Sequence, residues 1–450
     1  MSARLLLAGT HSSTGKTTVA LGLLAAWRRR GLRPAPFKAG PDYIDPTLHA
    51  RAAGRPSRNL DVWLLEQAAL RGVLERGLRG AGIAVIEGVM GLFDGIGASH
   101  EGSTAALARA LDTPVVLVLD VAGMSGTAAA LVLGCQQIQP HVRLAGVVLN
   151  RVGSDGHLQA TADAIRLATG LPTVGSLPDD PSIALPERHL GLVPAAEGGV
   201  TVAVLDRLAE LVEQRFDLAT LERIARAASP LPPLESPSDH ESPAAVVRIA
   251  VAQDRAFGFY YQDAFDVLSD SGAETVPFSP LTDASVPAGV QGIYLGGGFP
   301  ELYAEELSTN VPMRTDLQRR ARQGTPFYAE CGGLMALGRS LTTFDGHTLP
   351  MFGVLPFASR MQSQTVTIGY REVEALRSSA LLSAGERVRG HEFHWSVGDE
   401  PAPQVAAYRV IGQDRLEGFC VGSVLGSYVH LNFAGRSDIA RRYVTSLAGQ

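Results

Sequence analysis

Short apolar runs alternate with helix-forming stretches along the first 200 residues of the chain. The apolar runs are expected to form strands at residues 4–8, 34–38, 83–87, 115–119, 144–149 and 173–176. Helix formers fill long stretches between them, such as residues 16–30 and 103–111. Strands that are apolar throughout and separated by helices indicate a parallel sheet with both faces covered.

A segment rich in proline and serine interrupts this pattern at residues 229–245. Between Ser229 and Pro243 it holds five prolines and four serines, a composition typical of a linker. The pattern then restarts, with strands expected at 247–252, 273–277 and 292–295 and a helix at 260–269. The glycine signatures of the two halves differ, so the second half is not a repeat of the first. We therefore expect two α/β domains, 1–228 and 246–450.

Composition is that of an ordinary globular protein, with 46% hydrophobic and 19% charged residues in a chain of 450. The net charge of −6 argues against a general nucleic-acid binder, which would carry a basic surface. No run approaches the roughly 20 apolar residues of a membrane helix, so no membrane partner is expected. Three widely spaced cysteines, Cys135, Cys331 and Cys420, match no disulfide or zinc pattern. A cytoplasmic location fits these features best.

Only two lysines occur in the chain, Lys16 and Lys38, although lysine and arginine together number 39. A coding bias towards arginine explains the imbalance and makes the two surviving lysines informative. The ammonium of lysine is a compact point charge, whereas the guanidinium of arginine is a broad planar fork, so a tight phosphate cradle accepts lysine alone. The two positions therefore point to nucleotide chemistry.

Residues 9–18 combine a glycine-rich turn with Gly-Lys-Thr-Thr between an expected strand and an expected helix. This is the setting of a phosphate-binding loop, in which backbone N–H groups and the helix N-terminus bind a triphosphate. Lys16 would neutralise the β- and γ-phosphates, and the Thr17 hydroxyl would bind Mg²⁺. The first glycine lies one residue earlier than in the commonest spacing. The predicted ATP-binding residues here are Gly9, Thr14, Gly15, Lys16, Thr17 and Thr18.

Further polar residues follow other strands of the first domain, at the sheet edge where ligands of parallel sheets bind. Lys38 opens the segment KAGPDYIDP, and Glu87 opens EGVMGLFDG. Carboxylates there can bind Mg²⁺ directly or through water, so Asp45 and Glu87 join Thr17 as predicted metal ligands. Lys38 and Asn150 are predicted ATP contacts, Asn150 through an adenine edge. The residues predicted to act on the substrate or the phosphoryl group are Asp42, Tyr43, Asp45 and Asp94.

The second domain carries the residues of a different reaction. Cys331 lies between an expected strand and helix, flanked by Ala329 and Gly333, as in a sharp turn that exposes a nucleophile. A helix N-terminus favours the thiolate. The predicted oxyanion hole comprises backbone N–H groups of Gly297, Gly298 and Gly332. His430, late in the chain, is the predicted base, and the sequence leaves open which group orients it.

The order of these motifs matches the class I (triad) glutamine amidotransferases, and the whole chain resembles the cobyrinic acid a,c-diamide synthase family. The resemblance covers nearly everything except the linker. The N-terminal half of the chain resembles a dethiobiotin-synthetase-type nucleotide domain. One position departs from the wider amidotransferase pattern, in which a glutamate commonly stands two residues after the catalytic histidine. Here that residue is Asn432. The motifs that carry the match are KAGPDYIDP (38–46), EGVMGLFDG (87–95), LGGGFPE (295–301), AECGG (329–333) and RGHEFHWS (389–396).

The resemblance implies an ATP-dependent amidation of the a and c acetate side chains of a corrin, cobyrinate or hydrogenobyrinate. Domain 1–228 would bind ATP and the corrin and form acyl phosphates, and domain 246–450 would release ammonia from L-glutamine. Ammonia would then pass between the domains. The resemblance also favours corrin-facing or interdomain contacts for His391, Glu392 and His394, which are too few and wrongly spaced for zinc.

Three other interpretations stay open at this point. Nickel-sirohydrochlorin a,c-diamide synthases are close relatives that the sequence separates poorly. Cobyric acid synthases share both domains but lack the GPDYIDP stretch. A partitioning or regulatory P-loop ATPase would explain Lys16 but not Cys331 or His430. The sequence leaves a homodimer open, and it does not say whether the corrin carries cobalt.

Overall fold

The apolar runs of the N-terminal half form one parallel sheet in the computed structural model of the chain. The strand order is β3-β2-β4-β1-β5-β6-β7, and all six predicted strands are present. The three-residue strand β3 was not predicted, because the sequence RNL at the sheet edge has only one apolar residue. The strands are β1 (Arg4–Gly9), β2 (Pro34–Ala39), β3 (Arg58–Leu60), β4 (Ile83–Gly91), β5 (Val115–Asp120), β6 (Leu144–Val152) and β7 (Thr173–Pro178).

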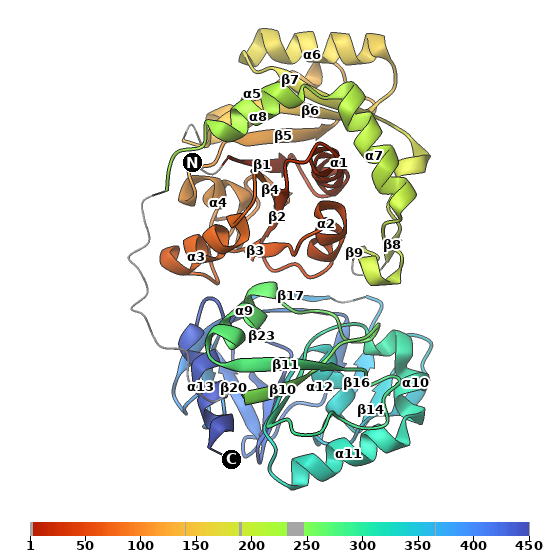
Figure 1. Cartoon of the computed structure of the whole chain (residues 1–450), viewed down its shortest axis with the longest axis vertical. Coiled ribbons are helices and arrows are strands. Elements are labelled where there is room, and N and C mark those ends of the chain that lie inside the picture. The colour runs from red at the N-terminus through yellow and green to blue at the C-terminus, as the bar shows by residue number, and fades with distance from the viewer. Residues whose placement is uncertain (1–2, 140, 189–190, 232–246, 365, 450) are drawn as a thin grey trace. The chain divides into compact units, whose positions relative to one another are not determined.

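Helices cover both faces of this sheet. Figure 1 shows α1, α2 and α7 together on one side of it, with α3 and α4 on the other. The arrangement agrees with right-handed crossovers between parallel strands. The helices are α1 (Lys16–Arg29), α2 (Asp45–Ala53), α3 (Gln67–Leu78), α4 (Thr104–Ala110), α5 (Thr127–Ile138), α6 (Asp155–Thr169), α7 (Val202–Arg215) and α8 (Leu218–Arg226), and a short hairpin pairs β8 (Glu187–Arg188) with β9 (Gly191–Leu192).

Helix α1 lies at the centre of the N-terminal core. Its residues from Val19 to Trp27 are all buried, because the helix packs on the sheet and against both α2 and α7. An added Cβ at Gly22 would lie 2.8 Å from Val212 Cγ2 of α7, so a glycine allows the two helices this close approach. The core thus fixes the position and direction of the helix that follows the predicted phosphate loop.

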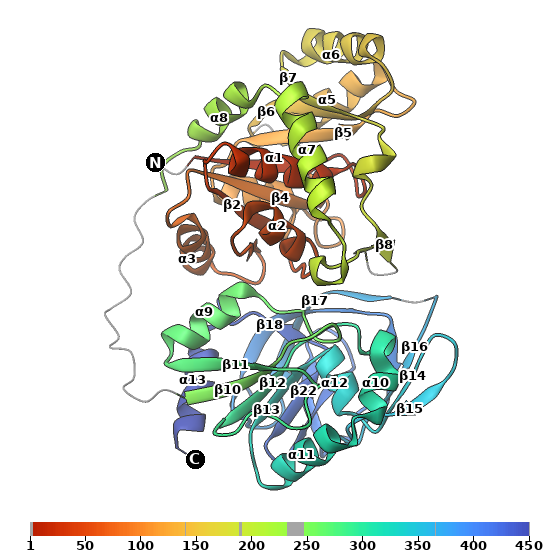
Figure 2. The same cartoon turned by 45° about the vertical axis from the view of Figure 1, so that its right-hand side comes forward.

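The C-terminal half builds a mixed sheet in the order β11-β10-β12-β13-β22-β21-β20-β17-β18-β23, with a small second sheet, β15-β14-β16-β19. Figure 2 shows β10, β12, β13 and β22 side by side in this half. The strands are β10 (Val247–Ala252), β11 (Ala273–Phe278), β12 (Gly292–Leu295), β13 (Phe327–Glu330), β14 (Ser340–Thr342), β15 (Thr348–Pro350), β16 (Ala358–Met361), β17 (Thr367–Ala375), β18 (Arg387–His394), β19 (Ser396–Gly398), β20 (Ala406–Val410), β21 (Leu416–Val421), β22 (Val424–Ser427) and β23 (His430–Leu431).

The first strands of this sheet, from β11 to β22, run parallel, and the later strands pair antiparallel. The predicted strands at 247–252, 273–277 and 292–295 and the predicted helix at 260–269 correspond to β10, β11, β12 and α9. The helices of this half are α9 (Gln262–Asp270), α10 (Ala304–Thr309), α11 (Val311–Arg322), α12 (Gly332–Leu337) and α13 (Ser437–Ala448). The expected α/β fold class is confirmed for both halves.

The structure describes residues 3–139, 141–188, 191–231, 247–364 and 366–449, and the chain divides into two compact units, 1–237 and 238–450. The predicted linker, 229–245, falls mostly outside the described residues, so its limits stay predictions. No helix in the described ranges is long and apolar enough to cross a bilayer.

Candidate active site

The loop between β1 and α1 lies where the sequence predicts a phosphate loop, and close packing leaves its glycines no room for a side chain. An added Cβ at Gly9 would lie 2.4 Å from Thr14 Oγ1, and one at Gly15 would lie 2.1 Å from Asn150 Nδ2. Gly15 also has a φ of +91°, which favours glycine. Asn150 Nδ2 donates to the Thr14 carbonyl at 2.9 Å. Asn150, near the end of β6, therefore braces the loop, and its contact with adenine stays a prediction.

The side chain of Lys16 folds back over this loop. Its Nζ donates to the His11 carbonyl at 3.1 Å and would lie 2.9 Å from an added Cβ at Gly9. Burial, reinforced by the positive charge of Lys38, lowers the pKa of Lys16 to about 8. A phosphate bound in the loop would favour the charged ammonium. Lys16 therefore sits where it can respond to a nucleotide, with Thr17 and Thr18 beside it in the first turn of α1.

The end of β2, the middle of β4 and the segment leading into α2 bring one lysine and three carboxylates together. Lys38 Nζ lies 2.5 Å from Asp45 Oδ2, 2.8 Å from Glu87 Oε1 and 3.9 Å from Asp42 Oδ2. Burial disfavours the ammonium, but the nearby carboxylates of Asp45 and Glu87 outweigh burial and raise the pKa of Lys38. Burial likewise opposes the Glu87 carboxylate, and the charges of Lys38 and His49 outweigh it and lower its pKa. Lys38 and Glu87 are therefore both charged at neutral pH.

Glu87 joins this cluster to two further side chains. Thr17 Oγ1 donates to Glu87 Oε1 at 2.8 Å, and His49 Nε2 lies 2.6 Å from Glu87 Oε2. His49 was not among the predicted residues. It lies four residues after Asp45 on α2, a spacing that puts two side chains on one helix face, but no helix was expected there from the sequence.

The oxygen atoms of Thr17, Asp45 and Glu87 suit Mg²⁺, which prefers hard oxygen ligands and is often completed by water and substrate phosphates. The 2.8 Å separation of Thr17 Oγ1 and Glu87 Oε1 places two such ligands side by side at the start of α1. Their donor atoms are of the type that the predicted ion prefers, but Glu87 Oε1 and Asp45 Oδ2 also bond the Lys38 ammonium, so binding of Mg²⁺ stays a prediction.

The remaining predicted residues of this unit shape its loops. Asp42 Oδ1 accepts from the backbone N–H groups of Ile44 and Asp45 at 2.8 and 3.0 Å and so closes the turn that precedes α2. Asp94 Oδ2 accepts from Gly91 N at 2.7 Å, which closes the turn after β4. Tyr43 is buried. Their action on a substrate or a phosphoryl group stays a prediction.

In the C-terminal unit, Cys331 occupies the sharp turn that the sequence predicts between β13 and α12. It has φ 47° and ψ −103°, a backbone conformation that is strained for any residue with a Cβ. The following glycines permit the turn. An added Cβ at Gly333 would lie 2.2 Å from the Leu295 carbonyl oxygen, and one at Gly332 would lie 2.9 Å from the Gly298 nitrogen.

His430, on β23, lies beside this turn. It is 1% exposed, and its neighbours include Cys331 and Glu330, with Glu330 Oε2 3.7 Å from His430 Nδ1. Burial alone would lower the pKa of His430, but these two partners outweigh it and raise that pKa to about 10. An added Cβ at Gly297 would lie 2.7 Å from His430 Cε1. The structure thus brings the predicted nucleophile, base and glycine loop together, an arrangement suited to acyl transfer through a thioester.

The RGHEFHWS segment forms much of β18, next to β23. His391 stacks on His430, with ring centroids 4.9 Å apart and an interplanar angle of 16°. Glu392 pairs with Arg371 and Arg415 at 2.5 and 2.8 Å, and His394 stacks on Tyr428. Each side chain therefore has partners in its own unit, which the sequence analysis did not foresee. Contacts with a corrin stay a prediction for this segment.

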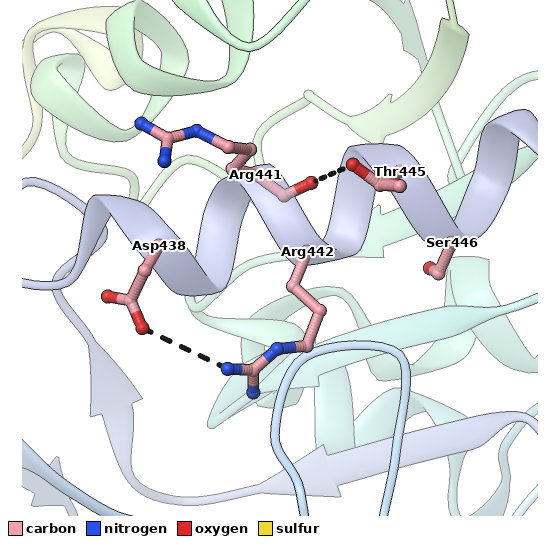
Figure 3. Close-up of a pocket in the computed structure, with 5 residues that line it drawn as sticks. All are labelled: Asp438, Arg441, Arg442, Thr445 and Ser446. Atoms are coloured by element: carbon pink, nitrogen blue, oxygen red, sulfur yellow. Dashed lines mark hydrogen bonds and ion pairs between the residues drawn. The ribbon is translucent and has the colours of Figure 1, made fainter.

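A surface pocket on α13 contains none of the predicted site residues. Figure 3 shows its lining, and Arg442 Nη2 lies 4.0 Å from Asp438 Oδ2 there. Arg442 Nη1 also donates to Glu386 Oε2 at 2.5 Å, so this guanidinium is engaged within the protein. The pocket is lined by Asp438, Arg441, Arg442, Thr445 and Ser446.

Comparisons with known proteins match both units. Residues 5–193 match the model described as the CobQ/CobB/MinD/ParA nucleotide binding domain, and residues 248–438 match the CobB/CobQ-like glutamine amidotransferase domain. A cobyrinate a,c-diamide synthase from Dehalococcoides mccartyi is 44% identical over 98% of this chain and 97% of that protein. The chain belongs to the cobyrinate a,c-diamide synthase family.

Other members of the family are nearly as similar. A cobyrinate a,c-diamide synthase from Synechocystis is 42% identical over 97% of this chain and 92% of that protein. A hydrogenobyrinate a,c-diamide synthase from Streptomyces coelicolor is 42% identical over 98% of this chain and 96% of that protein. The predicted membership of the cobyrinate a,c-diamide synthase family is thereby confirmed. A partitioning ATPase does not explain the amidotransferase match at residues 248–438.

The close approach of Gly297 and His430 predicts a position that is sensitive to substitution. Gly297→Ala places a methyl group 2.7 Å from His430 Cε1, so the imidazole must move. We expect glutamine-dependent amidation to fall about 100-fold, as displacements of about 1 Å can cause, while ammonium-dependent amidation persists. Gly258→Ala is the matched control, because its added Cβ meets nothing closer than 3.9 Å. Equal activity of the two variants would contradict the packing described.

The strained turn at Cys331 predicts a difference in stability between two variants that lack the thiol. Cys331→Gly should be about 1 kcal/mol more stable than Cys331→Ala, because glycine relieves backbone strain of order 1–3 kcal/mol but loses more entropy on folding. The measurement is urea unfolding followed by the fluorescence of Trp395 with Trp27 and Trp63 replaced by Phe, which isolates the C-terminal unit. If Cys331→Ala were more stable than Cys331→Gly, the backbone at position 331 would not be strained as described.

Proposed function

We propose that this chain amidates the a and c carboxylates of cobyrinate or hydrogenobyrinate, using ATP and ammonia derived from L-glutamine. The observation that carries the proposal is the presence of two reaction centres in one chain. One is the loop with Lys16 and the carboxylate cluster around Lys38, and the other is Cys331 with His430. Relatives with these names cover 98% of the chain, and each unit matches the corresponding domain model.

In the N-terminal unit, a corrin carboxylate would attack the γ-phosphorus of ATP. An acyl phosphate and ADP would form, and ammonia would then attack the acyl carbon and expel inorganic phosphate. Positioning and charge neutralisation supply most of the catalysis in phosphoryl transfer. Lys16 would neutralise the phosphate oxygens, and the N–H groups of the loop would hold them. When bound by Thr17, Glu87 and Asp45, Mg²⁺ would offset further negative charge on the phosphates.

In the C-terminal unit, the Cys331 thiolate would attack the amide carbon of glutamine. The N–H groups of Gly297, Gly298 and Gly332 would stabilise the oxyanion. His430 would give its proton to the leaving ammonia, and a thioester would remain. Water, activated by the now neutral His430, would hydrolyse this thioester to glutamate and restore the thiolate.

The substrate assay decides between the related activities. Purified protein would be given ATP, Mg²⁺ and glutamine with cobyrinate, hydrogenobyrinate or nickel-sirohydrochlorin, and diamide products would be identified by mass. We expect the diamide of a corrin. If only nickel-sirohydrochlorin were amidated, the result would favour the alternative activity, that of a nickel-sirohydrochlorin a,c-diamide synthase. A cytoplasmic location and a homodimer are further parts of the proposal, and mass in solution tests the dimer.

The division of labour between the units predicts a selective loss. Cys331→Ala should abolish glutamine-dependent amidation and leave ammonium-dependent amidation largely intact, because only the source of ammonia is lost. Steady-state rates with each nitrogen source measure this, and His430→Ala should behave similarly with some residual activity. A Cys331→Ala variant that is equally inactive with a high ammonium concentration would contradict the proposal.

The geometry of the phosphate loop predicts that charge alone does not suffice at position 16. Lys16→Arg should eliminate amidation with either nitrogen source, because a planar guanidinium does not fit where the slim lysine side chain lies over Gly9. The assay is corrin amidation with saturating ATP, Mg²⁺ and ammonium. Near-wild-type turnover would refute the phosphate-loop assignment. Lys38→Arg should be less severe, because its phosphate contact is inferred only from its motif.

A further inference from the structure

In class I glutamine amidotransferases a glutamate two residues after the catalytic histidine commonly orients that histidine, but in this chain the residue at that position makes a different contact. That residue is Asn432, two residues after His430. Asn432 Oδ1 accepts from the backbone N–H of Ala434 at 2.9 Å, which closes a local turn. An amide engaged in this way also carries no negative charge to stabilise an imidazolium. The structure must therefore supply an orienting carboxylate from elsewhere if one acts here.

Glu330, the residue immediately before the nucleophile, provides a carboxylate beside the base. Glu330 lies at the end of β13 and is 2% exposed. Its Oε2 lies 3.7 Å from His430 Nδ1. The other nitrogen of the ring, Nε2, lies on the side of the glycine loop, 3.5 Å from where a Cβ on Gly297 would stand. A proton held on Nδ1 towards Glu330 leaves Nε2 for exchange with the sulfur.

Three hydrogen bonds fix the Glu330 carboxylate in this place. Oε2 accepts from the Tyr294 hydroxyl at 2.8 Å. Oε1 accepts from the Tyr328 hydroxyl and from the backbone N–H of Leu431, the latter at 2.9 Å. Burial raises the pKa of both tyrosines well above its usual range, so their hydroxyls stay protonated donors. The bond to Leu431 ties the carboxylate to the residue that follows His430 in the chain.

We propose that Glu330 is the positioning residue of His430, replacing in space the glutamate that other class I amidotransferases carry two residues after the histidine. The proposal rests on the glutaminase reaction at Cys331 proposed above. Glu330 would orient the imidazole through Nδ1 and stabilise the imidazolium that forms when Cys331 is a thiolate. It would touch neither glutamine nor the reacting atoms.

The groups that face His430 include both charged and neutral side chains. Glu330 and Cys331 come from β13 and the turn after it, and His391 and His394 come from β18. Burial, followed by the charge of His430, lowers the pKa of His391 well below its usual range. The stacked ring of His391 is therefore neutral, and it does not replace the charge of Glu330.

The decisive experiment compares Glu330→Gln with the wild type in steady-state glutaminase assays. We expect kcat to fall about 100-fold, at the lower end of what positioned acid–base groups contribute, with KM for glutamine nearly unchanged. Loss of the carboxylate makes the imidazolium less stable, so His430 gives up its proton at lower pH. The alkaline limb of the kcat/KM profile should therefore move to lower pH.

Two further variants separate positioning from a structural role. Glu330→Asp keeps the charge but shortens the side chain, so kcat should fall less and the alkaline limb should stay in place. Glu417→Gln is the matched control, because Glu417 is a buried glutamate of the same unit that accepts from Ser427 Oγ and Tyr428 N. It should leave the alkaline limb unmoved. Ammonium-dependent amidation by Glu330→Gln reports that the rest of the enzyme is folded.

The outcomes are distinguishable. A Glu330→Gln variant with near-wild-type kcat and an unmoved alkaline limb would overturn the proposal, and so would equal losses in Glu330→Gln and Glu417→Gln without a change of profile. The proposal would be supported if the alkaline limb moves to lower pH in Glu330→Gln and stays at its wild-type position in Glu330→Asp. Absence of glutaminase in the wild type would instead overturn the proposed function, whichever residue orients His430.

Discussion

Both candidate sites depend on one constraint, which is that polar functional groups of a buried parallel sheet collect near the carboxyl ends of its strands. A strand in the middle of such a sheet pairs its backbone on both sides, so functional groups collect in the loops that follow it. In the N-terminal unit, β2, β4 and β1 are neighbours in the sheet, and their C-terminal halves bring Lys38, Glu87 and the loop before Lys16 together. In the C-terminal unit, the neighbouring strands β12 and β13 do the same for the Gly297 loop and Cys331.

Buried charge is the second constraint, and each centre meets it with partners from its own loops. An isolated ion in a protein interior is costly, and removal of one partner from a buried pair costs about 3–5 kcal/mol. Lys38 is surrounded by carboxylates, and Glu87 bonds Lys38, Thr17 and His49. In the other unit, His430 faces Cys331 and Glu330. The polar residues of each site therefore depend on one another, because replacement of one leaves a buried charge of another without its partner.

The parts of the structure that could be predicted are those that a local sequence pattern determines. The strands of the N-terminal sheet are short and apolar throughout, so their existence could be read directly, and the Gly-Lys-Thr-Thr segment marks the start of α1. Cys331 could be placed on a turn because its neighbours are small. Strand β3 has two polar residues among three and gave no such signal. The antiparallel strands from β17 onwards mix exposed and buried positions, and their pairing joins residues far apart in the chain.

The same distinction explains why His49 and Glu330 escaped notice. Each contacts a partner that is remote in sequence, 38 residues away for His49 and Glu87 and 101 residues away for Glu330 and Leu431. In the sequence, Glu330 is recognisable only as the last residue of an expected strand. Its position beside His430 follows from the pairing of β18 with β23 and from the hydrogen bond that Leu431 donates to it. The orienting position of an imidazole is defined by its Nδ1 atom, not by a count of residues from the histidine. A carboxylate can therefore reach that position from any strand whose end is near enough, and β13 ends there, directly before Cys331.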